Sequence, residues 1–130
     1  MAVQPKQVVL REFNMPGTFA EAVTANRVCY YSGSGALSIA ASAANMPAGV
    51  TESAFDSGEV GEVVTKKIMR CITGGSITAG DLVVATTGGA VVKAGNSEPI
   101  VGRALSTQTT TGAYVEVELL IGSYSPAAYV

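Results

Sequence analysis

Residues 82–93 read Leu-Val-Val-Ala-Thr-Thr-Gly-Gly-Ala-Val-Val-Lys, with a valine-rich run on each side of Gly88 and Gly89. Valine favours strands because its branched side chain packs well on a pleated surface. A pair of residues that both tolerate positive φ is what the shortest hairpin turns require. This stretch therefore predicts a β-hairpin closed by a two-residue turn at Gly88-Gly89.

The segments that follow this hairpin continue the β pattern. A strand is predicted over residues 100–105, and a polar loop over 107–112 leads to a final strand. In that strand alternate residues fall on opposite faces, Val115, Val117, Leu119 and Ile121 on one and Tyr114, Glu116, Glu118 and Leu120 on the other. Such alternation predicts an antiparallel strand with one face in the core and the other mostly in water.

The segments before the hairpin are short, apolar and separated by glycine-rich turns. Residues 27–31 and 36–40 predict a second hairpin, and residues 49–53 predict an extended segment. The long run 62–73 fits both helical and strand spacing. Its β-branched content and the glycines that flank it favour a strand.

Together these segments predict an all-β fold, a single small antiparallel β-sandwich or barrel-like domain over residues 25–122. Residues 1–24 are interpreted as an extended N-terminal arm whose strand-like run is Gln7–Phe13. Residues 18–24 fit a short capped helix and a loop equally well. Residues 123–130 are interpreted as a short C-terminal tail. Its two tyrosines predict either docking onto a neighbouring copy or a frayed end.

The composition predicts a molecule that acts through its surface. Hydrophobic residues make up 48% of the chain and charged residues 14%, whereas soluble domains usually carry about 25% charged residues. So few charges indicate that part of the exterior is covered by copies of the chain or by another protein. No apolar run approaches the length of a membrane span, and the N-terminus lacks the pattern of a signal peptide. No membrane contact is expected.

The charge balance argues against nucleic acid as a partner. Eight lysines and arginines against ten acidic residues give a net charge of −2, with a pI near 5.0. Affinity for phosphates depends on clustered cations, and only Lys66, Lys67 and Arg70 approach a cluster.

Groups able to support catalysis are sparse in this sequence. The chain has no histidine, which removes the commonest general base and the histidine-containing triads. The acidic residues are scattered singly and are interpreted as solvated charges of turns and faces. Cys29 and Cys71 match no metal-binding spacing and are interpreted as buried free thiols, with a disulfide as the alternative. We expect no enzymatic activity, no cofactor and no metal site.

The order and spacing of several turn-plus-strand segments resemble the head decoration (capsid cement) proteins of tailed bacteriophages. The resemblance covers about Val23 to Ile121. Its segments are 23–29, 46–52 (Met-Pro-Ala-Gly-Val-Thr-Glu), 57–64, 75–83 (Gly-Ser-Ile-Thr-Ala-Gly-Asp-Leu-Val), 88–94, 100–105 (Ile-Val-Gly-Arg-Ala-Leu) and 112–120. No single segment is diagnostic, and residues 1–24 and 123–130 lie outside the resemblance.

The resemblance implies a non-enzymatic protein, made in the bacterial cytoplasm, that joins the outer surface of an assembled phage head. It implies a homotrimer that bridges neighbouring major capsid proteins and stabilises the shell. The arm supplies the candidate capsid contacts, with pairing inside its own domain or oligomer left open: Gln7, Val8, Val9, Leu10, Arg11 and Phe13. Tyr124 and Tyr129 are candidate oligomer contacts. The alternatives are a phage tail or fibre component and a non-catalytic carbohydrate- or peptide-binding module.

Overall fold

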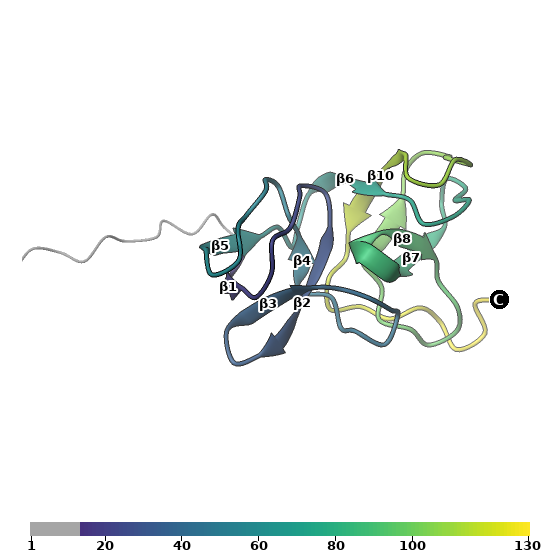
Figure 1. The fold of residues 1–130 in the computed structure, drawn as a ribbon. Helices are drawn as coiled ribbons and strands as arrows, with labels where there is room; N and C mark the ends of the chain where they lie inside the picture. The colour runs from purple at the N-terminus through teal and green to yellow at the C-terminus, as the bar shows by residue number, and fades with distance from the viewer. Residues whose placement is uncertain (1–13) are drawn as a thin grey trace, which may run out of the picture.

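The computed structural model describes residues 14–130, which hold ten strands in two sheets and one short 3-10 turn (Figure 1). The first sheet has the order β4 (Gly49–Val50), β2 (Val28–Gly33), β3 (Ala36–Ile39), β1 (Met15–Phe19), β5 (Val60–Val63). The second has the order β6 (Ile68–Ile72), β10 (Tyr114–Leu119), β9 (Gly102–Ala104), β7 (Leu82–Ala85), β8 (Val91–Lys93). The predicted all-β class is confirmed.

The first sheet curls until its two edges meet. Val64, just after β5, forms an antiparallel bridge with Val50 of β4, and each residue donates its N–H to the other's carbonyl at 2.9–3.0 Å. This closure removes the free edges that would otherwise expose unpaired backbone groups. One pair departs from the antiparallel prediction, because β1 runs parallel to β3.

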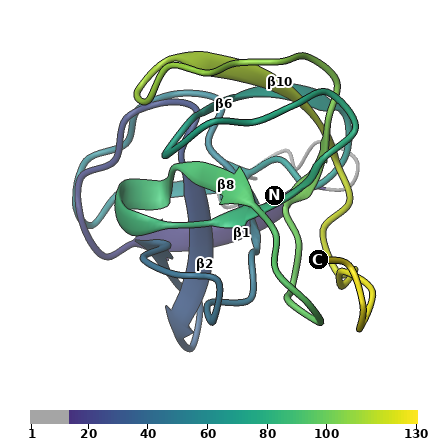
Figure 2. The same cartoon turned by 90° about the vertical axis from the view of Figure 1, so that its right-hand side faces the viewer.

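The second sheet also approaches closure, which gives it a barrel-like shape. Thr73, after β6, forms a parallel bridge with Val91 of β8, and Gly74 donates its N–H to the Val91 carbonyl at 2.8 Å. Figure 2 shows β6 and β10 side by side, in agreement with their antiparallel register. Along β10 exposed and buried residues alternate, so the predicted core face is confirmed.

The core consists of three apolar clusters, and the largest one joins the two sheets. It combines Val28, Val50 and Val64 from the first sheet and its border with Val83, Val115 and other residues of the second. A second cluster lies inside the first sheet around Phe19, Leu37 and Val63. The third lies against β7 and β8 and is covered in part by Tyr129.

The hairpin of β7 and β8 is confirmed, but its predicted two-residue turn is wrong. Ala85 pairs with Val91, so five residues connect the strands, and Thr87–Gly89 form a 3-10 turn. Gly88 and Gly89 both have φ of 72°. Gly89 also donates its N–H to the Ala40 carbonyl at 2.8 Å, because this longer loop reaches across to the first sheet. The two glycines thus shape a contact between sheets.

The sequence predicts an extended arm over residues 1–24 and a short helix or a loop over residues 18–24. Both predictions are wrong where β1 lies. Met15–Phe19 form β1, which pairs antiparallel with β5 and parallel with β3. Val23 forms an isolated bridge with Phe55. These long-range backbone pairings outweigh the local helix signal, since a one-turn helix is marginal without packing.

The run 62–73 is extended, as predicted, but it contributes to two strands. β5 ends at Val63 and β6 begins at Ile68, and Lys67 between them has φ of 137°. Lys67 forms an ion pair with Glu52. The segment between β5 and β6 therefore carries the chain from the first sheet to the second.

Among residues 14–130, no helix has the length and apolar character needed to cross a bilayer.

Candidate functional site

An apolar pocket opens where the two sheets meet. Its volume is about 460 Å³, within the range of roughly 300–1,000 Å³ that is usual for binding pockets. Four separate parts of the chain line it: β1, β2, the loop before β4, and the segment between β5 and β6, with a further residue after β10. The lining residues are Met15, Tyr30, Tyr31, Met46, Pro47, Ala48, Thr65, Lys66 and Ile121.

The walls of the pocket are fixed by the surrounding fold. Tyr31 donates its hydroxyl proton to the Pro16 carbonyl at 2.6 Å, which ties β2 to β1 beside the opening. Loss of solvent around this hydroxyl raises the pKa of Tyr31. Tyr30 and Ile121 pack against the cluster that joins the two sheets. These contacts hold the aromatic and aliphatic walls in place before any partner arrives.

Two methionines form the exposed rim. Met15 is 42% exposed and Met46 is 45% exposed, although both are large apolar side chains. Methionine adapts to irregular partners because it is unbranched and polarisable. An apolar hollow with an adaptable apolar rim is therefore suited to receive an apolar side chain of another molecule.

The predicted contact residues Gln7, Val8, Val9, Leu10, Arg11 and Phe13 lie outside the described residues. The first described residue, Asn14, donates from Nδ2 to Glu62 Oε1 at 3.0 Å. The next residue, Met15, is part of the pocket rim. The predicted contact segment, residues 7–13, is therefore followed within two residues by Met15, which lines the pocket.

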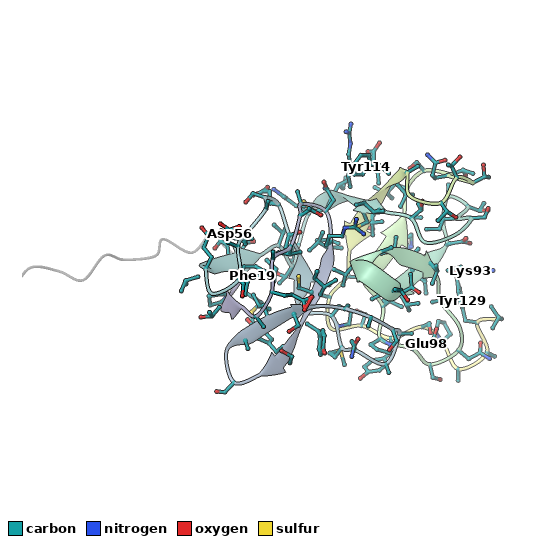
Figure 3. All side chains as sticks on the ribbon, in the orientation of Figure 1. Phe19, Asp56, Lys93, Glu98, Tyr114 and Tyr129 are labelled. Carbon is teal, nitrogen blue, oxygen red and sulfur yellow. The ribbon has the colours of Figure 1, made fainter. Side chains whose placement is uncertain are left out.

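Tyr129, a predicted oligomer contact, makes its contacts within its own chain. Its hydroxyl oxygen accepts the Leu82 N–H at 2.8 Å, and Lys93 Nζ lies 5.6 Å from the ring centroid. Figure 3 shows Tyr129 and Lys93 side by side, far from Tyr114. The tail therefore packs on β7 and β8, and the expectation of a frayed end is wrong for this residue.

Tyr124, the other predicted oligomer contact, is 57% exposed. Its backbone forms a bridge with Pro99. The next residue, Ser125, is buried, and its hydroxyl donates to the Gly95 carbonyl at 2.6 Å and accepts the Glu98 N–H at 2.8 Å. The backbone at Tyr124 is therefore held by hydrogen bonds, and its side chain is exposed to solvent.

The cysteines are inert in this fold. Both are buried free thiols, as predicted, and they lie in different sheets. Burial, together with the negative charge of Glu21, raises the pKa of Cys29 to about 12. Burial alone raises the pKa of Cys71 to about 12. Neither thiol is a nucleophile at neutral pH. Within residues 14–130, no three histidine, cysteine or acidic side chains lie close enough to hold a metal ion.

Sequence reasoning missed the pocket. Its residues come from five stretches of chain that carry no shared local pattern, and Met15 fell within the predicted arm. The one available signal was the pair Met46-Pro47 in a segment of small residues, where a large apolar side chain has few local partners.

Comparison with known proteins identifies a family and a solved structure of similar fold. A family model described as phage cement protein matches residues 10–119. The solved structure of the N base of head fiber gp8.5 from bacteriophage phi29 has a TM-score of 0.68 and 21% sequence identity, covering 82% of this chain and 92% of that one. No curated protein matches the chain. At this identity the solved structure establishes the shared fold alone.

Proposed function

The chain belongs to the phage cement protein family, and we propose that it binds the outer surface of the phage head and cements neighbouring major capsid proteins. The family is one of structural phage proteins. The observation that carries the proposal is the family match, which spans nearly the whole β fold from residue 10 to residue 119. The chemistry agrees, since the pocket supports binding and the net charge of −2 does not favour packaged DNA.

Cementing follows from mass action. A head filled with DNA is pushed outward and fails where capsid subunits separate. A protein that binds only across closed subunit junctions stabilises the closed shell, and the stabilisation grows with the logarithm of its free concentration once that exceeds the dissociation constant. No turnover is needed for this effect.

A homotrimer would strengthen such binding without tighter individual contacts. Linking several weak contacts raises the overall affinity by roughly 10²- to 10⁴-fold when the geometry allows them to engage together. We propose Tyr124 as an oligomer contact because its ring is 57% exposed on a fixed backbone. Tyr129 is proposed as an oligomer contact too, with its hydroxyl oxygen accepting the Leu82 N–H and its proton left to donate.

The segment Gln7–Phe13 is the proposed capsid contact outside the β fold. Its valines favour an extended backbone, and an extended segment gains affinity by adding a strand to an exposed sheet edge of a partner. Gln7, Val8, Val9, Leu10, Arg11 and Phe13 supply the side chains that set specificity. Within residues 14–130 the first sheet is closed and the second approaches closure, which leaves little free strand edge for the segment to pair with in its own chain.

Deletion of residues 1–13 tests the proposal without touching β1. The shortened chain should remain folded and form an oligomer with the same number of copies as the full chain, yet it should no longer co-sediment with heads that lack this protein. Full retention of binding would remove the segment from the mechanism. Antibody labelling of whole virions provides the second test. Label on the head supports the proposal, and label confined to the tail would replace it with a role as a tail or fibre component.

A further inference from the structure

The outer face of the second sheet is exposed over β6, β10 and β9. Exposed and buried residues alternate along β6 and β10, and the antiparallel register sets the outward residues side by side in rows. Large apolar side chains of all three strands are exposed on this face: Ile68 by 57%, Tyr114 by 52% and Leu105 by 44%. Apolar side chains that gather on one face, rather than lying scattered, mark a protein interaction site.

The neighbouring strands β7 and β8 are covered by the chain itself. Tyr129 of the C-terminal tail packs against the cluster of Val84, Ala94 and Ile100, and its hydroxyl oxygen accepts the Leu82 N–H. The tail therefore buries apolar surface at one side of the second sheet, whereas the outward residues of β6 and β10 are left exposed.

Two arginine–glutamate pairs lie on the exposed face. Arg70 of β6 is directly opposite Glu116 of β10, and Arg103 of β9 is directly opposite Glu118 of β10. All four side chains are exposed, and none of them forms an ion pair with another of residues 14–130. The face is therefore neutral, with both signs side by side, in a chain whose net charge is −2. A second copy of the chain meets no net repulsion there.

The register makes this face complementary to itself. A two-fold axis that runs between β6 and β10, parallel to both strands, exchanges the positions of paired residues when the outer faces of two copies meet. Arg70 of one copy then lies over Glu116 of the other, and Glu116 lies over Arg70. In the next row Ile72 lies over Tyr114 in the same way. A contact of this kind joins the same patch of two subunits.

We infer that the outer face of β6 and β10 docks onto the same face of a second copy of this chain around that axis. Sheets that pack face to face lie about 10 Å apart, and their side chains interdigitate. Ile68, Ile72 and Tyr114 supply the apolar surface that the contact buries. Arg70 and Glu116 set the register, because charges across an interface contribute more to specificity than to affinity.

This contact is separate from the proposed oligomer contacts of the C-terminal tail. Figure 3 shows Tyr114 far from Tyr129, so one copy can use both surfaces at once. The face then joins copies that belong to different oligomers, and on a phage head such links connect neighbouring cement molecules. The inference goes beyond the proposed function and does not depend on binding to the capsid.

Charge reversal across the axis tests the inference with the purified full chain. Arg70→Glu places glutamate over glutamate at both symmetric positions, and Glu116→Arg places arginine over arginine. In sedimentation equilibrium each variant should pass from its smallest stable species to heavier ones with at least about tenfold weaker affinity than the wild-type chain. An equimolar mixture of the two variants should associate about as tightly as the wild-type chain, because both contacts across the axis then pair opposite charges.

Arg103→Glu is the matched control for effects within one chain. It creates the same like-charge pair between neighbouring strands, here with Glu118, but it lies on β9 outside the two-fold contact. It should associate like the wild-type chain. Equal weakening in Arg103→Glu, no recovery in the mixture, or a wild-type mass that matches that of Arg70→Glu at every concentration would each overturn the inference.

Photocrosslinking locates the contact without altering a charge. A benzophenone side chain in place of Tyr114 should link to the β6 segment that contains Ile72 in another copy. Mixing chains with and without a heavy-isotope label separates links between copies from links within one chain. The same group in place of Val60, which is 61% exposed in the first sheet, should give no link to this face. Absence of mixed-isotope links from position 114 would overturn the inference.

Discussion

Gly102 in β9 lies so close to Glu118 in β10 that a β-carbon at position 102 would be 2.1 Å from the Glu118 carbonyl oxygen. The obstacle is backbone in a paired strand, so no side-chain rotation relieves it. Gly102 pairs with Leu119 in the same ladder and with Val83 on its other side. The strand order of the second sheet thus depends on the absence of a side chain at this position.

Gly102→Ala should destabilise the protein strongly because β9 has to shift away from β10. We expect the free energy of unfolding in urea to fall by about 3 kcal/mol, at the upper end of the usual cost of overpacking. Gly33→Ala is the matched control, since a β-carbon there meets nothing within 4 Å. Equal stabilities of the two variants would contradict the close approach of β9 and β10.

Phe55 is confined between an aromatic ring and a glycine. Its ring stacks on Phe19 with centroids 4.3 Å apart and planes 8° from parallel. A β-carbon at Gly61 would lie 2.4 Å from Phe55 Cε1. We expect Gly61→Ala to lower the free energy of unfolding by about 2 kcal/mol, because it pushes the ring off Phe19.

A double-mutant cycle separates this clash from any general effect of alanine in β5. In a Phe55→Ala background the β-carbon at position 61 has room. The cost of Gly61→Ala should therefore fall to about 0.5 kcal/mol or less, leaving a coupling energy above about 1 kcal/mol. Additive effects in urea unfolding would show that Gly61 and Phe55 do not press on one another.

Local patterns in the sequence predicted the elements whose partners are close in the chain. The alternation over 114–121 and the valine runs around Gly88 gave β10 and the hairpin of β7 and β8, because each pattern is repeated within one segment. The length of the hairpin loop was not predictable in this way. It is set by the hydrogen bond from Gly89 to Ala40, a residue 49 positions earlier in the sequence.

Neither β1 nor the pocket could be predicted from the sequence, because both depend on residues that are far apart in the chain. Met15–Phe19 contain a proline and a glycine, and they become a strand only because β3 and β5 supply partners on both sides. The pocket combines Met15, Tyr30, Met46, Lys66 and Ile121, which come together only when both sheets have formed. Apart from Met46, whose small neighbours leave it few local apolar partners, their sequence context identifies none of them as part of a site.

The buried thiols predict a loss of stability at alkaline pH. In the folded chain the pKa values of Cys29 and Cys71 are raised from 9.0 to about 12. Unfolded thiols lose their protons above pH 9, whereas folded thiols keep theirs. Their stabilising contribution is therefore complete below pH 9 and is lost as the pH rises from 9 toward 12. Each thiol lowers the free energy of unfolding by about 1.4 kcal/mol per pH unit in that range.

Urea unfolding at pH 7 and at pH 10.5, with reductant present, measures this loss. The variant Cys29→Ala/Cys71→Ala is the control, because it lacks both thiols and keeps every other side chain. Its stability should fall less steeply than that of the wild-type chain. Parallel pH profiles would contradict the raised pKa values. Below pH 8, reductant should leave the melting temperature of the wild-type chain unchanged, since both thiols are free.

The Tyr129 hydroxyl oxygen accepts one of the hydrogen bonds that hold the C-terminal tail. Tyr129 accepts the Leu82 N–H at 2.8 Å, while Lys93 lies over its ring. Tyr129→Phe removes the acceptor and keeps the ring, so the free energy of unfolding should fall by about 1 kcal/mol. Exchange of the Leu82 amide hydrogen should become faster. Tyr124→Phe, at a ring that is 57% exposed, should change neither quantity. Slow exchange at Leu82 in the Tyr129→Phe chain would contradict this role, since the tail would then be held by its other contacts: the Ser125 hydroxyl donates to the Gly95 carbonyl at 2.6 Å, and Asn96 Oδ1 accepts the Val130 N–H at 2.7 Å.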